Sequence, residues 1–266
     1  MDEKYGNLIP NGKLLDSKPR TILFDATKCI GCRQCVHACK DWNDHPRTTP
    51  YELSSTNWIT MEPPLLEGLS LIWARNSCMH CEFPMCAAVC PVEAITKYEE
   101  GPVVITQAVC IGCDYCVYAC PWGVISKDAI TQKVNKCTMC SDRISENKNP
   151  PFCVRACPVE ALDFGFHEDI LVKAQKRAKE INGYLYGDRE AGGTQLLYVL
   201  KEKREEYGIR PVGPEKYPKH TIPVGLMIRD LFTLRCGFKG KIRAFYLAII
   251  HPKRLLYRYG PWQKAA

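Results

Sequence analysis

The most informative motif of this 266-residue sequence is Cys110-Ile-Gly-Cys113-Asp-Tyr-Cys116-Val-Tyr-Ala-Cys120-Pro121. Its spacing, C-x2-C-x2-C-x3-C-P, is the cysteine run with which bacterial ferredoxins hold iron–sulfur clusters. Gly112 has no side chain, so the loop backbone can close on a cluster and direct N–H groups at its sulfurs. Residues 116–120 are predicted to form one short helical turn, which Pro121 ends because proline disfavours helix in the residue before it. The fourth cysteine then points towards a second cluster.

Three further cysteine runs accompany this stretch. The first repeats the x2, x2, x3 spacing, the second contains an x4 interval, and the fourth contains a twelve-residue loop; they span residues 29–39, 78–90 and 137–157. Three segments, Cys90-Pro-Val-Glu-Ala-Ile95, Cys120-Pro-Trp-Gly-Val-Ile125 and Cys157-Pro-Val-Glu-Ala-Leu162, are versions of one element: cluster helix, proline stop, short strand. The repetition indicates a duplicated ferredoxin unit.

The chain has seventeen cysteines and no apolar segment after Met1 that would form a signal peptide. An odd count, with most cysteines at C-x2-C and C-x3-C intervals, argues against a disulfide framework. Zinc sites usually join two C-x2–4-C pairs across a dozen or more residues, a pattern that only the fourth run fits on its own. The spacings therefore predict four [4Fe–4S] clusters, with sixteen cysteines as the iron ligands.

The ferredoxin rule that the fourth cysteine of a run serves the other cluster assigns the ligands. We name the four predicted ligand sets quartets A to D. Quartet A is Cys29, Cys32, Cys35 and Cys157; quartet B is Cys78, Cys81, Cys86 and Cys120; quartet C is Cys110, Cys113, Cys116 and Cys90; quartet D is Cys137, Cys140, Cys153 and Cys39. The pairing of A with D is inferred from topology. The unit that holds A and D is divided into two segments of the sequence, and the unit that holds B and C is inserted between them.

The predicted fold class is α+β, with two ferredoxin-like units, one nested in the other, an insertion at 41–69 and a C-terminal helical extension. Strands are expected at 21–24, 69–74 and 196–200, a β-hairpin around Gly101-Pro102, and an amphipathic helix over 167–181. The expected division is a lead-in at 1–20, an outer unit at 21–74 and 126–166, an inner unit at 75–125, a helix and strand extension at 167–210, and a basic docking tail at 211–266.

Several residues outside the quartets are interpreted as structural. His37 and His80 are expected in loops or at the surface, because each quartet is complete without them. Lys136 could raise the potential of a neighbouring cluster, although a surface lysine is the plainer interpretation. Gly192-Gly193-Thr194 is expected to be a turn and not a phosphate loop, because it lacks a lysine. Cys236 belongs to no quartet and is expected to be a small apolar residue of the tail.

Positive charge is concentrated at the C-terminal end. Residues 201–266 hold fifteen Lys/Arg against five Asp/Glu, which is +10, and residues 1–200 carry −3, which together give +7. Two apolar stretches in the tail, 224–238 and 242–250, are too short or too interrupted by charge to span a bilayer. They are expected to lie on a membrane surface or to dock against a partner subunit, and we favour the partner. A zinc-rich nucleic-acid-binding module is the alternative from another functional class.

The four runs together resemble the four-cluster iron–sulfur subunit of the molybdopterin oxidoreductase family, over about residues 20–200. The resemblance is closest to the beta subunits of formate dehydrogenases. Counterparts there are Trp58-Ile-Thr-Met61, Cys78-Met-His-Cys-Glu82, Cys137-Thr-Met-Cys-Ser-Asp-Arg143 and Gly192-Gly-Thr-Gln-Leu-Leu-Tyr-Val-Leu200. The segment Tyr186-Gly-Asp-Arg-Glu-Ala-Gly-Gly-Thr-Gln195 also resembles hydrogenase-associated relatives.

The resemblance implies an electron-transfer subunit without a catalytic site of its own, which relays electrons between a catalytic subunit and a respiratory acceptor. The implied partner is the molybdenum or tungsten subunit of a formate dehydrogenase; the alternatives are a nickel–iron hydrogenase subunit and the catalytic subunit of another molybdopterin reductase. A membrane cytochrome b or another quinone-reactive subunit would lie beyond it. The implied location is a membrane-associated complex on the extracytoplasmic face, reached by export with the catalytic partner; the cytoplasm is the alternative. Several relatives end in a transmembrane helix, and this sequence shows none.

Overall fold

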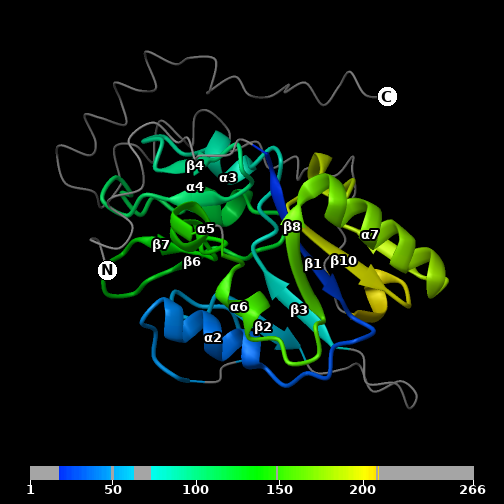
Figure 1. The fold of residues 1–266 in the computed structure, drawn as a ribbon. Coiled ribbons are helices and arrows are strands. Elements are labelled where there is room, and N and C mark those ends of the chain that lie inside the picture. Colours follow the sequence, from blue (N-terminus) through cyan, green and yellow to red (C-terminus); the bar gives the residue numbers. More distant parts are fainter. Residues whose placement is uncertain (1–17, 49–50, 63–72, 148, 208, 210–266) are drawn as a thin grey trace.

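The computed structural model describes residues 18–48, 51–62, 73–147, 149–207 and 209 (Figure 1). The expectations for residues 1–17 and 210–266, including both apolar stretches of the tail and Cys236, lie outside the described residues. The helices are α2 (Gln34–Trp42), α3 (Met85–Ala88), α4 (Tyr115–Ala119), α5 (Ser141–Asn147), α6 (Phe152–Arg155) and α7 (His167–Glu180), with 3-10 turns η1 (Glu190–Gly192) and η2 (Arg204–Tyr207). The strands are β1 (Arg20–Asp25), β2 (Ile59–Glu62), β3 (Ala74–Ser77), β4 (Ile95–Lys97), β5 (Val103–Ile105), β6 (Ser126–Lys127), β7 (Val134–Asn135), β8 (Leu162–Phe166), β9 (Tyr184–Tyr186) and β10 (Leu196–Leu200).

A four-stranded sheet in the order β8-β1-β10-β9 forms the largest layer. β1 pairs in parallel with β10 and antiparallel with β8, and β9 runs antiparallel to β10. All of β10 is buried, as expected for an apolar strand in the middle of a sheet. α7 lies along one face (Figure 1), and the contact is made by Ile170, Ala174, Ala178, Leu23, Leu197 and Val199.

The opposite face of this sheet packs against cysteines. Side chains alternate between the two faces of a strand, so the neighbours of the α7-facing residues point the other way. Ile22 and Phe24 of β1 and Tyr198 of β10 belong to a core that also holds cysteines of quartets A, B and D. The sheet therefore separates a conventional helix layer from the layer that contains the cysteine runs.

Three two-stranded sheets, β2–β3, β4–β5 and β6–β7, support the runs on the cysteine side. The hairpin β4–β5 contributes Ile95, Val103 and Ile105 to a second core. That core also contains Cys86 and Cys116, from the second and third runs. The inner part of the chain thus has a small core of its own, built around short strands.

Most of the expected elements are present. The strands at 21–24 and 196–200, the hairpin around Gly101 and the helix at 167–181 are confirmed as β1, β10, β4–β5 and α7. Gly192 and Gly193 form a turn with positive φ, as expected. Most of the strand expected at 69–74 lies outside the described residues, since 69–72 are not described; β3 begins at Ala74 and ends at Ser77, immediately before Cys78.

Candidate iron–sulfur sites

Each cysteine run begins with the same backbone turn. The residue before the second cysteine has a left-handed conformation in all four runs, with φ of 68° at Gly31 and Gly112, 48° at His80 and 59° at Met139. In the fourth run this turn aims an N–H at the first sulfur, since Met139 N donates to Cys137 Sγ at 3.4 Å. A loop N–H group therefore donates to sulfur in the fourth run. Two of the four runs form the left-handed turn without glycine, at His80 and Met139.

The fourth cysteine of the later runs starts a second repeated turn. The residue three positions after it is left-handed in each copy, with φ of 54° at Glu93, 63° at Gly123 and 50° at Glu160. The next N–H donates back to the cysteine, from Ala94 to Cys90 Sγ at 3.2 Å and from Ala161 to Cys157 Sγ at 3.3 Å. The third copy does the same, since the backbone of Val124 hydrogen-bonds the thiol of Cys120. The repeat seen in the sequence is thus a repeat of sulfur-binding geometry.

The third run also has the predicted helical turn. α4 spans Tyr115–Ala119 and places Cys116 in the buried core. Cys120 follows it with extended backbone (φ −75°, ψ 114°), because the residue before a proline is held out of the helical region. The fourth cysteine of the run is thereby turned away from the first three.

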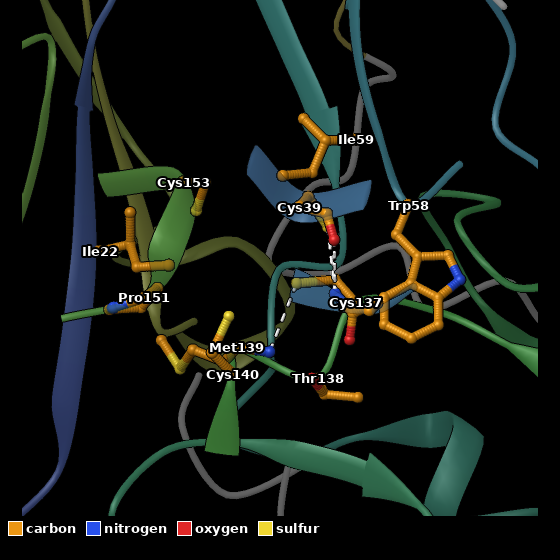
Figure 2. A pocket seen from close by; sticks show the side chains of 11 residues that line it. Ile22, Cys39, Trp58, Ile59, Cys137, Thr138, Met139, Cys140, Pro151 and Cys153 are labelled. Carbon is orange, nitrogen blue, oxygen red and sulfur yellow. Dashed lines mark hydrogen bonds between the residues drawn. The ribbon is translucent and has the colours of Figure 1, made fainter. Parts of the chain in front are cut away.

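Quartet D lines a pocket with about 290 Å³ of space free of protein atoms, a volume that includes its opening to solvent. All four of its cysteines are buried, and Figure 2 shows them around this space, with Ile22, Ile59 and Trp58 as apolar neighbours. Burial raises the pKa of Cys39 well above its usual value, and the charges of Cys137, Cys140 and Cys153 raise it further. The cysteine of the first run therefore lies among the three of the fourth run.

Quartet B lines a second pocket, with about 330 Å³ of space free of protein atoms, its opening to solvent included. Its members, Cys78, Cys81, Cys86 and Cys120, all border this space, together with Trp122 and Lys136. Burial, followed by the charges of the other three members, raises the pKa of Cys81 well above its usual value.

The members of quartets A and C are also near one another. Burial is the largest cause that raises the pKa of Cys29, and the charges of Cys157 and Cys32 add to it. Burial likewise raises the pKa of Cys113 to about 12, with Cys90 and Cys110 of quartet C adding to the rise. Cys32 is exposed, and the other thiols in these two pairings are half-buried. Quartets A and C thus reach closer to the surface than D does.

Thiols of neighbouring quartets also affect one another. In each case burial is the largest cause of a raised pKa, and a thiol from another quartet adds to it. The pairs are Cys153 acting on Cys35 (D on A), Cys78 acting on Cys137 (B on D) and Cys86 acting on Cys116 (B on C). The order of neighbours is therefore A–D–B–C.

The donor arrangement suits a cluster better than a single ion. Zinc needs its ligands around one ion, with Zn–S distances of about 2.3 Å. A [4Fe–4S] cluster binds one thiolate at each iron, so its four sulfurs surround a wider space. The pockets within quartets B and D provide such a space.

The structure corrects the expectations for Lys136 and His37 and confirms that His80 lies in a loop. Lys136 is not a surface lysine, because it is 3% exposed. His80 lies in a loop but is 1% exposed, and its Nδ1 accepts a hydrogen bond from Val103 N at 2.9 Å. His37 lies on α2 and is half-buried. Neither histidine is needed by a quartet.

The sequence interpretation missed two residues that contact the cysteines. Arg75 is 2% exposed, and its Nη2 donates to Cys153 Sγ at 3.8 Å. Asn43 donates from Nδ2 to the carbonyl oxygen of Cys39 at 2.7 Å and approaches its Sγ at 3.6 Å. The available signal for Arg75 was a charged residue within three positions of Cys78, in a strand that leads into a cysteine run.

Comparison with known proteins agrees with the geometry. Two matches to the 4Fe-4S dicluster domain cover residues 28–94 and 69–167. The protein is 36% identical over 214 residues to the formate dehydrogenase-O iron–sulfur subunit of Escherichia coli, which is 73% of its own length and 71% of that relative. It is 33% identical over 215 residues to the formate dehydrogenase iron–sulfur subunit of Haemophilus influenzae, or 73% and 69% of the two proteins.

A third relative is a subunit of a different kind of enzyme, a reductase. The protein is 40% identical over 151 residues to a subunit of the anaerobic dimethyl sulfoxide reductase of E. coli, which is 54% of its own length and 72% of the relative. Two of these three relatives match over more than two-thirds of both sequences. The family expected from the runs is confirmed: this protein belongs to the [4Fe–4S] iron–sulfur subunits of the molybdopterin oxidoreductase family.

Proposed function

We propose that this protein passes electrons between a catalytic subunit and a respiratory acceptor, with quartets A to D holding four [4Fe–4S] clusters. The neighbour order A–D–B–C is the observation that carries the proposal, because a relay needs its one-electron carriers in a line. The burial of the cysteines also supports the proposed relay. All four cysteines of quartet D are buried, whereas Cys32 of quartet A is exposed and most of quartet C is half-buried. The ends of the line are thus the parts that partner proteins can approach.

The ligand sets also support the nested arrangement of units. Quartets B and C use cysteines from 78 to 120 alone, which fits an inner unit at 75–125. Quartets A and D combine cysteines from both sides of it, which fits an outer unit at 21–74 and 126–166. β10, from the proposed extension at 167–210, pairs with β1 of the outer unit. The extension therefore completes the sheet on which the outer unit rests.

We propose a molybdenum or tungsten formate dehydrogenase subunit as the catalytic partner, because the relatives with the longest matches include several formate dehydrogenase subunits. We place the complex at a membrane, on the extracytoplasmic face, with a cytochrome b or another quinone-reactive subunit as the acceptor. In the described residues, no helix is both long and apolar enough to cross a bilayer.

Cys116→Ser in the complete complex tests the proposed relay. Cys116 is a buried member of quartet C, so its loss should remove the cluster at one end of the line. Formate oxidation with a dye that accepts electrons at the catalytic subunit should persist, while electron delivery to the natural acceptor should fall at least tenfold. Cys236→Ser is the matched control, because this cysteine belongs to no quartet. Unchanged delivery in Cys116→Ser would refute a linear relay.

The partner is tested on the native complex, purified without oxygen and examined by mass spectrometry and metal analysis. A large molybdenum or tungsten subunit that oxidises formate is the expected result. A nickel–iron subunit would replace formate by hydrogen as the electron source. Zinc without iron would refute the whole proposal.

A further inference from the structure

The side chains of Arg75 and Lys136 are buried beside the cysteine quartets, and no carboxylate is paired with either of them within the described residues. Arg75 is 2% exposed and Lys136 is 3% exposed. None of the ion pairs found in this part of the protein involves either side chain. A buried charge is costly unless an opposite charge or several hydrogen bonds compensate it. The negative groups that surround these two cations are the cysteines.

Arg75 lies between quartets A and D. Its Nη1 donates to Ser77 Oγ, and its Nη2 donates to Cys153 Sγ of quartet D. Its Nε is buried and has no hydrogen-bond partner within the described residues. Burial raises the pKa of Cys35 in quartet A and of Cys137 in quartet D, and the Arg75 charge opposes both rises. The guanidinium thus faces both quartets and retains an unused N–H.

Lys136 lies between quartets B and D. Its Nζ donates to the carbonyl oxygens of Val103 and Cys137, the latter at 3.1 Å. The side chain lines the pocket of quartet B. It also opposes the rise that burial causes in the pKa of Cys86, a member of that quartet. The residue therefore stands at the boundary where the second and fourth runs meet.

Quartet C has no such buried cation in the part of the structure that is described. After burial and backbone hydrogen bonds, the charges that shift the pKa values of Cys113 and Cys116 come from other thiols and from Asp114. The two buried cations are thus placed unevenly along the line A–D–B–C. Quartet D is next to both, A and B are each next to one, and C is next to neither.

We propose that Arg75 and Lys136 are potential-setting residues, which raise the reduction potential of the cluster in quartet D together and those in A and B singly. The proposal rests on the function proposed above. A cluster gains one negative charge when it is reduced, and a nearby positive charge in a medium of low dielectric constant stabilises the reduced form. Arginine keeps its charge at every physiological pH, so its effect is permanent.

The test is a redox titration of the complete, cluster-loaded protein, followed by EPR at low temperature. Arg75→Gln should lower two of the four potentials, and Lys136→Gln should also lower two, with one signal common to both variants. The fourth signal should stay at its wild-type potential in both. We expect at least a tenfold change in the reduction equilibrium of the shared cluster, which is about 59 mV for one electron. Lys133→Gln is the matched control, because Lys133 lies three positions away and its Nζ donates to Gln107 O, which belongs to no cysteine run.

Each other outcome has a defined meaning. Four signals with unchanged potentials in both glutamine variants would overturn this inference and leave the relay intact, whereas fewer than four clusters in the wild type would overturn the proposed function. Arg75→Lys and Lys136→Arg should restore wild-type potentials, and a shift that persists in them would assign the effect to shape and not to charge. If the glutamine variants lose their clusters, retention in the two charge-conserving variants supports the need for charge, and loss in those as well refutes it.

Discussion

Gly112→Ala tests whether close packing is what requires glycine in the loop of the third run. A Cβ at this position would lie 1.9 Å from the carbonyl oxygen of Gln132. Gly112 also has a φ of 68°, but His80 and Met139 carry side chains at the same loop position with φ of 48° and 59°. The left-handed backbone therefore does not exclude a side chain by itself. At Gly112 a side chain is excluded by the backbone carbonyl of Gln132.

The expected loss can be worked from these two contributions. A left-handed alanine costs about 1–2 kcal/mol relative to glycine. Forcing an added carbon into a well-packed site costs about 1–3 kcal/mol, and a backbone carbonyl yields less easily than the end of a side chain. We expect Gly112→Ala to destabilise the loop between Cys110 and Cys113 by roughly 2–5 kcal/mol. That is enough to impair cluster binding at quartet C.

Iron content and thermal unfolding of the anaerobically purified protein measure the effect. Gly112→Ala should lose about a quarter of the iron, since one of four clusters depends on this loop. Gly123→Ala is the matched control: its φ is 63°, and Glu93 and Glu160 carry side chains at the equivalent position of the other copies. It should keep its iron. Full iron and wild-type stability in Gly112→Ala would refute the packing argument, and equal losses in both variants would show that backbone conformation decides.

Two further predictions follow from burial and hydrogen bonding. On exposure to air, the cluster of quartet A should be lost before that of quartet D, because Cys32 is exposed and every cysteine of D is buried; Mössbauer spectra taken during the exposure would show this, and simultaneous loss would contradict it. Tyr198→Phe should reduce stability by about 1–3 kcal/mol, because Tyr198 Oη donates to the buried carbonyl oxygen of Arg75 at 2.9 Å. Thermal unfolding measures it, with Tyr184→Phe, at 48% exposed, as a control that should change little.

Local features of the fold were predictable because the cysteine runs fix them. The helical turn before Pro121, the hairpin around Gly101 and the repeated turns after the fourth cysteines all depend on neighbouring residues. Proline, glycine and closely spaced cysteines determine the backbone conformation of residues only a few positions away. Such local features can therefore be predicted from a single sequence. The ligand quartets remain a prediction, and the thiol neighbours in the structure are those that the ferredoxin rule leads one to expect.

Pairing between distant segments could not be predicted in the same way. The apolar residues of β10 indicated a buried strand. They did not indicate that its parallel partner would be β1, more than 170 positions earlier in the sequence. The placement of Lys136 was missed for a similar reason. Lysine is usually exposed, and its burial here depends on Val103 O, which comes from another hairpin. Arg75 likewise acquires its role only when the first and fourth runs meet at Cys153.

The burial of quartet D gives a physical reason for positive charges beside it. Burial is the largest cause that raises the pKa values of Cys39, Cys137 and Cys140, which means that the site disfavours negative charge. The same penalty acts on a reduced cluster, because reduction adds a negative charge. Quartet D stands between A and B, so without compensation it would be the hardest site to reduce and would interrupt the line. Arg75 and Lys136 offset that penalty at quartet D, where burial limits stabilisation by solvent. Quartets A and C lie closer to the surface and keep more of their solvation. A relay whose middle cluster is buried therefore needs positive charges beside that cluster.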